Sequence, residues 1–394
     1  MGRPLEGIRV LDFTWAQQGP YATTLLADMG AEVIKVEHRE GERGRGVGGR
    51  RSAPTSYFVA HNRGKHSITL DVRRPEAREI VNRFVKQVDV VVSNMRPGAM
   101  DRLGFDYETF SALNPRIVYA CASAFGPHGD RTPVPGNDII GQASGGIMLR
   151  SGPEDGPPTP TGAAIADQVG AMILCSGILA ALVKRERTGE GEQVDVSLYG
   201  SQIALQSWEI NTESFSGDTA PRAGLGHPLL TSRSVWRSYQ TADGWLVIGG
   251  ATTDKFAALC DELGLNELAE QYPDDRSRAA AMAEIHPQLE ERIRTGTTDE
   301  WIARFRARDI FCGPVQTYAD ILADPQARAN GYIAAMPHAS FGEALVVGSP
   351  IQFGREPRTE VEPPPELGDS TERYLTELGY SWDDIESFRE AAVI

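Results

Sequence analysis

The sequence is poor in several features that mark particular classes of protein. Among its 394 residues there are only four cysteines, which form no Cys-x-x-Cys pair and have no histidine neighbour at metal-ligand spacing. Positive charge is in deficit, with 39 lysines and arginines against 54 aspartates and glutamates and a net charge of −15. We therefore expect no metal or redox cofactor and no binding to nucleic acid or anionic membranes. Reduced thiols are expected at Cys121, Cys175, Cys260 and Cys312.

Several sequence motifs are also missing. The N-terminus enters a strand pattern without the segments of a signal peptide, and no apolar run is expected to approach membrane-spanning length. The absence of a G-x-S-x-G motif disfavours a serine hydrolase. The glycine-rich stretch 44–49 lies in an arginine-rich segment that does not directly join a strand to a helix. We expect a mobile surface loop there rather than a dinucleotide site, and a cytoplasmic protein.

The first part of the chain alternates between strand and helix patterns. Its length is sufficient for two domains, and 41% hydrophobic with 24% charged residues is typical of a globular protein. Strand patterns occur at residues 8–13, 32–36, 65–70, 88–93 and 117–123, and helix patterns at 20–29, 75–87 and 107–113. This alternation predicts a doubly wound α/β sheet.

The pattern changes after a linker rich in glycine, proline and arginine. Residues 234–239 and 244–249 predict an antiparallel hairpin. Helix patterns follow it at 255–263, 277–294 and 298–307, and again near the C-terminus at 371–378 and 382–391. We expect a smaller α+β domain here, with the last two helices packing on the body of the protein.

The stretch 158–201 carries an isolated acid in an apolar segment. Between Ile165 and Val183 the only polar side chains besides Asp167 are Gln168 and Ser176, which predicts a buried helix. Asp167 then has two interpretations. It caps the first turn of the helix, or it is a nucleophilic carboxylate that forms acyl intermediates. The local sequence leaves both open.

Eight stretches along nearly the whole chain, in the same order, resemble the class III CoA-transferases. This family includes formyl-CoA and carnitine CoA-transferases and, as a racemising branch, 2-methylacyl-CoA racemase. The stretches are GIRVLDFTWAQQGPYATTLLADMGAEVIKVE, HNRGKHSITLDVRRPE, NMRPGAMDRLGFDYE, GNDIIGQASGG, PTGAAIADQVGAM, GILAALVKRERTGEGEQVDVSL, CGPV and GSPIQF.

The resemblance implies an α/β fold with a particular domain layout. A large Rossmann-like domain is built from both chain ends, residues 1–216 and the return segment 321–394. A linker at 217–228 leads to a smaller inserted α+β domain at 229–320. Two such chains are expected to interlock as a homodimer.

The resemblance also implies a chemical role for Asp167. Its carboxylate attacks a donor acyl-CoA, giving a mixed anhydride and CoA thiolate, and an aspartyl-CoA thioester then passes CoA to a free carboxylic acid. Gln17, with backbone amides, is expected to stabilise the oxyanions. CoA and acyl-CoA are substrates, and no permanently bound cofactor is expected.

Further CoA contacts are implied by matching positions. They are Trp15, Ala16, His38, Leu70, Arg73, Asn94, Met95, Arg102, Leu103 and Asn137. Three positions depart from the formyl-CoA transferases, which resemble this chain but carry arginine at His38, lysine at Pro135 and histidine at Trp15. Fewer or rearranged phosphate contacts and a different acyl pocket are therefore expected.

Asn137 bears on the choice between reactions. The racemase branch carries a histidine here, and an amide lacks the basicity that exchange of an α-proton requires. CoA transfer is thus the leading hypothesis, with racemisation of a 2-methyl-branched acyl-CoA and non-catalytic acyl-CoA binding as alternatives. Candidates for the acyl pocket are His227, Pro228, Trp236 and the pair Gly249-Gly250, where a mobile glycine loop and a simple strand-ending turn both remain open.

Overall fold

The computed structural model of the protein describes residues 2–47, 55–217, 222–227, 229–338 and 342–394. The chain forms two compact units. Unit 1 comprises Met1–Gly145, Ala163–Leu205 and Asp324–Ile394, and unit 2 comprises Gly146–Gly162 and Gln206–Ala323. The domain boundaries implied by the resemblance stay a prediction.

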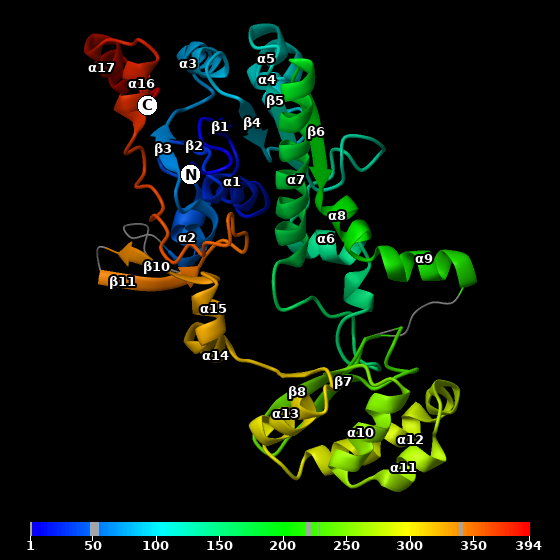
Figure 1. The fold of residues 1–394 in the computed structure, drawn as a ribbon. Coiled ribbons are helices and arrows are strands. Elements are labelled where there is room, and N and C mark those ends of the chain that lie inside the picture. The colour runs from blue at the N-terminus through cyan, green and yellow to red at the C-terminus, as the bar shows by residue number, and fades with distance from the viewer. Residues whose placement is uncertain (1, 48–54, 218–221, 228, 339–341) are drawn as a thin grey trace. The chain divides into compact units, whose positions relative to one another are not determined.

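Unit 1 is built on a six-stranded sheet in which every neighbouring pair is parallel (Figure 1). The strands are β1 (Arg9–Asp12), β2 (Glu32–Glu37), β3 (His66–Thr69), β4 (Val90–Ser93), β5 (Val118–Ser123) and β6 (Glu192–Ser197). Their order is β3-β2-β1-β4-β5-β6. The valine run of β4 is fully buried because helices cover both faces of the sheet. The predicted strands and their parallel pairing are confirmed.

Helices pack on both faces of this sheet. On one face, α1 (Gln18–Asp28) and α7 (Ile165–Thr188) enclose a core with the inward side chains of the strands. The other face is covered by α3 (Pro75–Val85), α5 (Tyr107–Leu113), α16 (Thr371–Glu377) and α17 (Trp382–Glu390). The C-terminal helices therefore belong to the same layer as helices from the first third of the chain.

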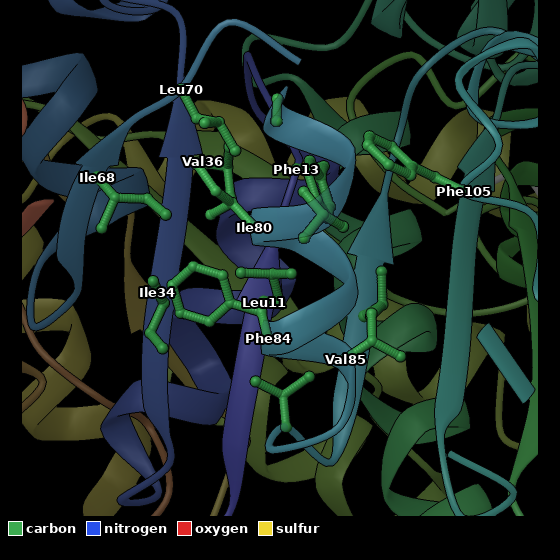
Figure 2. Packing of buried hydrophobic residues seen from close by; sticks show 14 of the residues in the cluster. Leu11, Phe13, Ile34, Val36, Ile68, Leu70, Ile80, Phe84, Val85 and Phe105 are labelled. Carbon is green, nitrogen blue, oxygen red and sulfur yellow. The ribbon is translucent and has the colours of Figure 1, made fainter. Parts of the chain in front are cut away.

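Figure 2 shows the second of these cores from close by. Ile80 and Phe84 of α3 lie over Leu11 of β1 and Ile34 of β2, and all four side chains are fully buried. A polar contact also joins the chain end to this sheet, because the Tyr374 hydroxyl donates to a Glu32 carboxylate oxygen at 2.8 Å. Apolar burial and this bond together hold the return segment against β2.

Several shorter elements complete unit 1. They are the 3₁₀ turn η1 (Arg43–Gly46), α2 (Ser56–Asn62), α4 (Ala99–Leu103), α6 (Asp138–Ser144), α8 (Leu198–Leu205), α15 (Pro325–Ala329), β10 (Ile333–His338) and β11 (Gly342–Val347). The antiparallel hairpin of β10 and β11, and helix α2, were not predicted from the sequence.

In its described part, the glycine-rich stretch forms the 3₁₀ turn η1, followed by the exposed Val47, rather than an irregular loop. Gly44 is buried within η1. The Arg45 guanidinium donates two hydrogen bonds to the buried carboxylate of Glu37, at 2.8 and 2.6 Å. An arginine on a buried carboxylate fixes the turn, because separating the pair would leave a charge without a partner. Gly48 and Gly49 lie outside the described residues.

Unit 2 contains a three-stranded antiparallel sheet with helices. Its strands are β7 (Trp236–Gln240), β8 (Trp245–Gly249) and β9 (Cys312–Pro314), in the order β7-β8-β9. The remaining elements are η2 (Ile147–Leu149), α9 (Ser207–Ser216), α10 (Thr253–Leu263), α11 (Asn266–Gln271), α12 (Asp275–Ile293), α13 (Thr298–Ala307) and α14 (Tyr318–Ala323). The predicted hairpin of β7 and β8 is confirmed, and β9 adds a third strand to it.

Helix α7 differs from the prediction in two respects. Only one face is buried, since Ala171, Leu174 and Ile178 are fully covered while Met172 and Val183 are 47% and 60% exposed. Within the described residues, α7 is the one helix that is long enough and apolar enough to cross a membrane. The expectation that no apolar run approaches that length was therefore wrong. Its buried face packs on the sheet as a core helix does.

Candidate active site

The strand order reverses between β1 and β4, so the loops after these strands are neighbours at the carboxyl end of the sheet (Figure 1). Ligands of open α/β folds bind at such a switch point. A cavity of about 210 Å³ lies here, lined by these loops, the loop after β5 and the first turn of α7. The predicted residues that line it are Trp15, Ala16, Gln17, Asn94, Met95, Asn137 and Asp167.

Asp167 lies in the first turn of α7 but does not cap it. The backbone N–H groups of Ala166 and Asp167 instead donate to Oδ1 of Asp138, at 2.8 and 3.2 Å. The N-cap residue Ala164 makes no side-chain capping bond. Asp138 thus satisfies the free amides of the helix from outside it. The capping role belongs to Asp138, which leaves the Asp167 carboxylate for the cavity.

The electrostatic setting of Asp167 favours its neutral form. Burial, followed by the negative charge of Asp138, raises the pKa of Asp167 from 3.8 to about 7. A carboxylate with this pKa is poorly solvated when ionised and therefore more reactive than one in water. Perturbed acids in a cavity are candidates for chemistry.

Two adjacent glutamines face this region from the start of α1. Gln17 is half-buried and lines the cavity. Gln18 also lines it and is 4% exposed, and its Nε2 has no hydrogen-bond partner within the described part of the chain. The amide of Gln18 lies over Gly170, where a Cβ would be 2.6 Å from Nε2. A buried donor without an acceptor is costly, and no pattern in the sequence pointed to it.

The loop after β1 holds an unusual backbone conformation. Ala16 has a φ of 65°, which an alanine adopts at a cost of roughly 1–2 kcal/mol. On one side of it, the Asn94 side chain accepts from the Trp15 N–H at 2.9 Å and donates to the Trp15 carbonyl at 2.7 Å. Asn94 was predicted as a CoA contact, and its side chain here is paired with the backbone of the facing loop.

Comparison with known proteins is consistent with this geometry. The family model described as CoA-transferase family III matches residues 5–371. This chain belongs to CoA-transferase family III. The predicted resemblance is thereby confirmed, and so is the prediction that the protein is a transferase enzyme.

Relatives of this family III enzyme match along the full chain. A mouse succinyl-CoA:glutarate CoA-transferase is 33% identical over 401 residues, covering 100% of this chain and 90% of the relative. A formyl-CoA:oxalate CoA-transferase of Streptomyces coelicolor is 35% identical over 413 residues, covering 100% and 99%. The crystal structure of a CAIB/BAIF family protein from Brucella suis has a TM-score of 0.85 at 31% identity, covering 96% of this chain and 100% of that one.

Other CoA contacts expected for the transferase lie at the ends of β2 and β3. Arg73 Nη2 is 3.1 Å from His38 Nε2, which brings these two residues together. Arg73 also forms a two-point hydrogen-bonded ion pair with Asp71, at 2.8 and 2.9 Å, and this contact lowers the pKa of Asp71 to about 2. Leu70 is 2% exposed and its side chain belongs to the core, so only its backbone can reach a ligand.

Arg102 and Leu103 end helix α4, close in sequence to a second cavity of about 300 Å³ in unit 1 of the transferase. This cavity shares five lining residues with the first, Met95, Arg96, Pro97, Ala122 and Ser123. Four acidic residues line it, Asp101, Asp106, Glu108 and Asp195, against one arginine, Arg96, and this excess of negative charge disfavours the phosphates of CoA. Arg102 is exposed and Leu103 packs partly on the core.

The predicted acyl-pocket residues of unit 2 have structural contacts of their own. His227 stacks on Trp208 with ring centroids 4.9 Å apart. Gly250 has a φ of 99°, and its N–H donates to the Val235 carbonyl at 2.9 Å, which is the geometry of a strand-ending turn. A Cβ at Gly250 would lie 3.1 Å from the Trp236 ring. Pro228 lies outside the described residues.

Sequence reasoning missed two aromatic residues of helix α2, Tyr57 and His61. Both lie near the first turn of α7, which carries Asp167. Burial, then the charge of Asp167, raises the pKa of Tyr57 to about 12. Burial lowers the pKa of His61 to about 4. Its Nδ1 lies 2.7 Å from the Tyr57 carbonyl, and its Nε2 is 3.5 Å from Gln168 Nε2. The only signal in the sequence was the pair of aromatic residues Tyr57 and Phe58, and no helix or strand was predicted there.

Proposed function

We propose that the enzyme moves CoA from an acyl-CoA donor to a free carboxylic acid, with Asp167 as the nucleophile. The observation that carries the proposal is a half-buried carboxylate in the switch-point cavity of a family III CoA-transferase. Its raised pKa of about 7 is that of a poorly solvated, reactive group.

The reaction proceeds without net gain or loss of protons or electrons. The Asp167 carboxylate adds to the thioester carbonyl and the carbon–sulfur bond breaks, giving a mixed anhydride and CoA thiolate. The thiolate attacks the aspartyl carbonyl, releases the donor acid and leaves an aspartyl-CoA thioester. The acceptor carboxylate attacks this thioester, expelling thiolate and forming a second anhydride. Thiolate then attacks the acceptor carbonyl, which restores Asp167.

Residues around the cavity supply position and charge stabilisation in this scheme. Gln17, together with loop amides, donates to the oxyanion of each tetrahedral intermediate. Asp138 fixes the first turn of α7 through the Ala166 and Asp167 amides. Fixed donors lower the barrier because they need no reorganisation when charge develops. His38, Arg73 and Arg102 are the proposed phosphate contacts.

We propose that the acceptor is a short dicarboxylic acid. Support comes from the names of the relatives, which pair a CoA ester with glutarate, oxalate or, for a 35% identical protein of Haloarcula marismortui, mesaconate. Each of these acids has a second carboxylate that a binding site must accommodate. Racemisation is the alternative, and Asn137 at the cavity wall disfavours it because an amide is not a base.

Mass spectrometry of the trapped intermediate tests the proposal. The protein is mixed with succinyl-CoA, formyl-CoA or other acyl-CoAs and then with hydroxylamine, which converts an aspartyl anhydride or thioester to a hydroxamate. We expect the label on the peptide with Asp167, and none in Asp167→Ala or the isosteric Asp167→Asn. If no donor labels wild type, and the substrate α-proton exchanges in deuterated water, the racemase alternative replaces this proposal.

We also propose an interlocked cytoplasmic homodimer. Support comes from the apolar side chains left uncovered along α7 and α8, among them Met172, Val183 and Ile203. Patches of this kind usually mark interaction surfaces. All four cysteines are free, as in proteins of a reducing compartment.

A further inference from the structure

The two loops at the switch point are joined by one side chain. Asn94, the first residue after β4, uses both ends of its amide on Trp15, accepting from the N–H at 2.9 Å and donating to the carbonyl at 2.7 Å. This two-point pairing fixes the orientation of the amide and of the Trp15 peptide groups. The sequence separation of 79 residues makes the bridge a purely tertiary feature.

The bridge ends immediately before a strained residue. Ala16 follows Trp15 and has a φ of 65°, a conformation that residues with a Cβ avoid. Such strain persists only where surrounding contacts enforce it. Gln17, the proposed oxyanion donor, comes next, so the direction of its backbone N–H and side chain depends on the Ala16 conformation.

A buried network holds the start of the loop, directly before Trp15. The Thr14 N–H donates to Oδ1 of Asp12 at 2.8 Å, and Lys35 Nζ donates to the Thr14 carbonyl at 2.8 Å. The side chains of Asp12 and Lys35 are fully buried. Thr14 is therefore anchored to the sheet, while Asn94 holds Trp15 from the facing loop. Both restraints therefore lie before Ala16, while on the other side the Gln17 carbonyl accepts from the Tyr21 N–H at 2.9 Å at the start of α1.

We propose that Asn94 is a positioning residue that clamps Trp15 so that Ala16 stays in its left-handed conformation and Gln17 points into the cavity of Asp167. This differs from the CoA contact that the family resemblance implies for Asn94. The inference rests on the proposed function for its catalytic consequence, but the clamp itself is a structural claim that can be measured without turnover.

Amide exchange tests the clamp directly. In wild type the Trp15 amide is protected by Asn94, so hydrogen–deuterium exchange of the peptide spanning residues 13–17 is slow. Asn94→Ala removes the acceptor and is expected to speed this exchange about 5- to 30-fold, the factor that one or two hydrogen bonds supply. Asn94→Asp keeps the acceptor but loses the donor, so an intermediate effect is expected. Unchanged exchange in Asn94→Ala would overturn the clamp.

A matched control separates the clamp from general loss of stability. Asn114 makes a similar side-chain bridge elsewhere in unit 1, donating to the carbonyls of Val85 and Val88 at 2.9 and 3.0 Å. Asn114→Ala should lower the melting temperature comparably and leave exchange in residues 13–17 as in wild type. If both variants speed that exchange equally, the effect is global and the proposal fails.

Rescue through Ala16 tests the catalytic role. Glycine adopts a positive φ without a steric penalty, so Ala16→Gly is expected to restore part of the labelling rate that Asn94→Ala loses. It should not restore protection of the Trp15 amide, which still lacks its acceptor.

CoA affinity is expected to change little in Asn94→Ala. Weakened CoA binding with a normal labelling rate and no rescue would make Asn94 a ligand contact instead. If wild type itself is not labelled at Asp167, the proposed function fails while exchange still decides the clamp.

Discussion

At the scale of single residues, the pKa of Asp167 connects the structure to reactivity. Burial and then the charge of Asp138 raise this pKa to about 7. Only the ionised carboxylate is a nucleophile, so the reactive fraction of unliganded enzyme increases as pH rises through this value. The two causes are separable, because Asp138 can be neutralised without removing the buried environment.

The first prediction concerns the pH profile of acylation. In single-turnover labelling, the wild-type rate is expected to rise with pH around an apparent pKa near 7. Asp138→Asn removes a negative charge but keeps an oxygen for the Ala166 and Asp167 amides, so its profile should shift to lower pH. Rapid quench with mass spectrometry measures both profiles. If the pH profile of Asp138→Asn is the same as that of wild type, the charge of Asp138 does not act on Asp167.

The second prediction concerns stability. The pKa of Asp167 is about 7 in the folded chain against an ordinary 3.8, so the folded state binds more protons between these values. Its ionisation therefore destabilises the fold progressively as pH rises from about 4 to 7, with the full penalty above 7. Asp167→Asn lacks this penalty and should be more stable at pH 8 by about 2 to 4 kcal/mol.

Urea unfolding of both proteins at several pH values measures this difference. It should shrink towards zero as the pH falls below about 3.8, since wild-type Asp167 then becomes neutral in the unfolded state as well as in the folded one. A difference that is independent of pH would mean that ionisation of Asp167 is not the cause.

The third prediction separates stability from activity at Gln18. Its buried Nε2 has no partner within the described residues, so Gln18→Leu should leave stability unchanged or raise it by about 1 kcal/mol. If this amide donates to the reacting oxygen, the same change should slow acylation about 100-fold or more. Thermal melting and labelling rates provide the two readouts. Loss of stability with normal labelling would assign Gln18 a purely structural role.

At the scale of elements, the N-terminus of α7 depends on a residue outside the helix. Asp138, at the start of α6, accepts from two amides of α7 and also from Gln142 Nε2 at 2.6 Å. Helices without a cap lose stability because their first amides lack acceptors. The position of Asp167 is thus set by contact between two helices rather than by α7 alone.

The fourth prediction follows from this cap. Asp138→Ala should lower the free energy of unfolding by about 1 kcal/mol, whereas Asp138→Asn retains an acceptor and should lose less. Hydrogen exchange at the start of α7 is expected to increase in the alanine variant and to stay near wild type towards the C-terminus of the helix. Equal loss in both variants would indicate that the charge, and not the acceptor, stabilises the helix start.

At the scale of the whole molecule, exposed apolar side chains on α7 indicate a surface that binds a partner. Val183 is 60% exposed and Met172 is 47% exposed, although the helix reads as buried in the sequence. Burying apolar surface on association stabilises a complex by about 25 cal/mol per Å². A second copy of the chain is the proposed partner.

The fifth prediction concerns assembly. Light scattering after size exclusion is expected to give a dimer for wild type and a lower mass for Val183→Glu combined with Met172→Glu. Each substitution places a charge in the proposed interface, where desolvation opposes association. Arg187→Glu, in the same helix near its exposed end, is a control for added negative charge. A monomeric wild type would contradict the homodimer.

The sequence by itself determined the parallel sheet of unit 1 and the main chemical candidate, but not the β10–β11 hairpin or helix α2. Strand and helix periodicity identified β1 to β5 and their helices because burial on both faces of a parallel sheet requires continuous apolar strands. Asp167 was recognisable because an acid is rare in an apolar helix. The family resemblance rests on motifs that are local in sequence.

The tertiary structure alone decided how these parts act together. The contacts of Asp138 with α7 and of Asn94 with Trp15 join segments far apart in the chain, 29 and 79 residues. The same holds for the burial that raises the pKa of Asp167 and for the approach of Tyr57. Local propensity carries no information on such pairings, because hydrogen-bond partners and desolvation are properties of the folded chain rather than of its neighbouring residues.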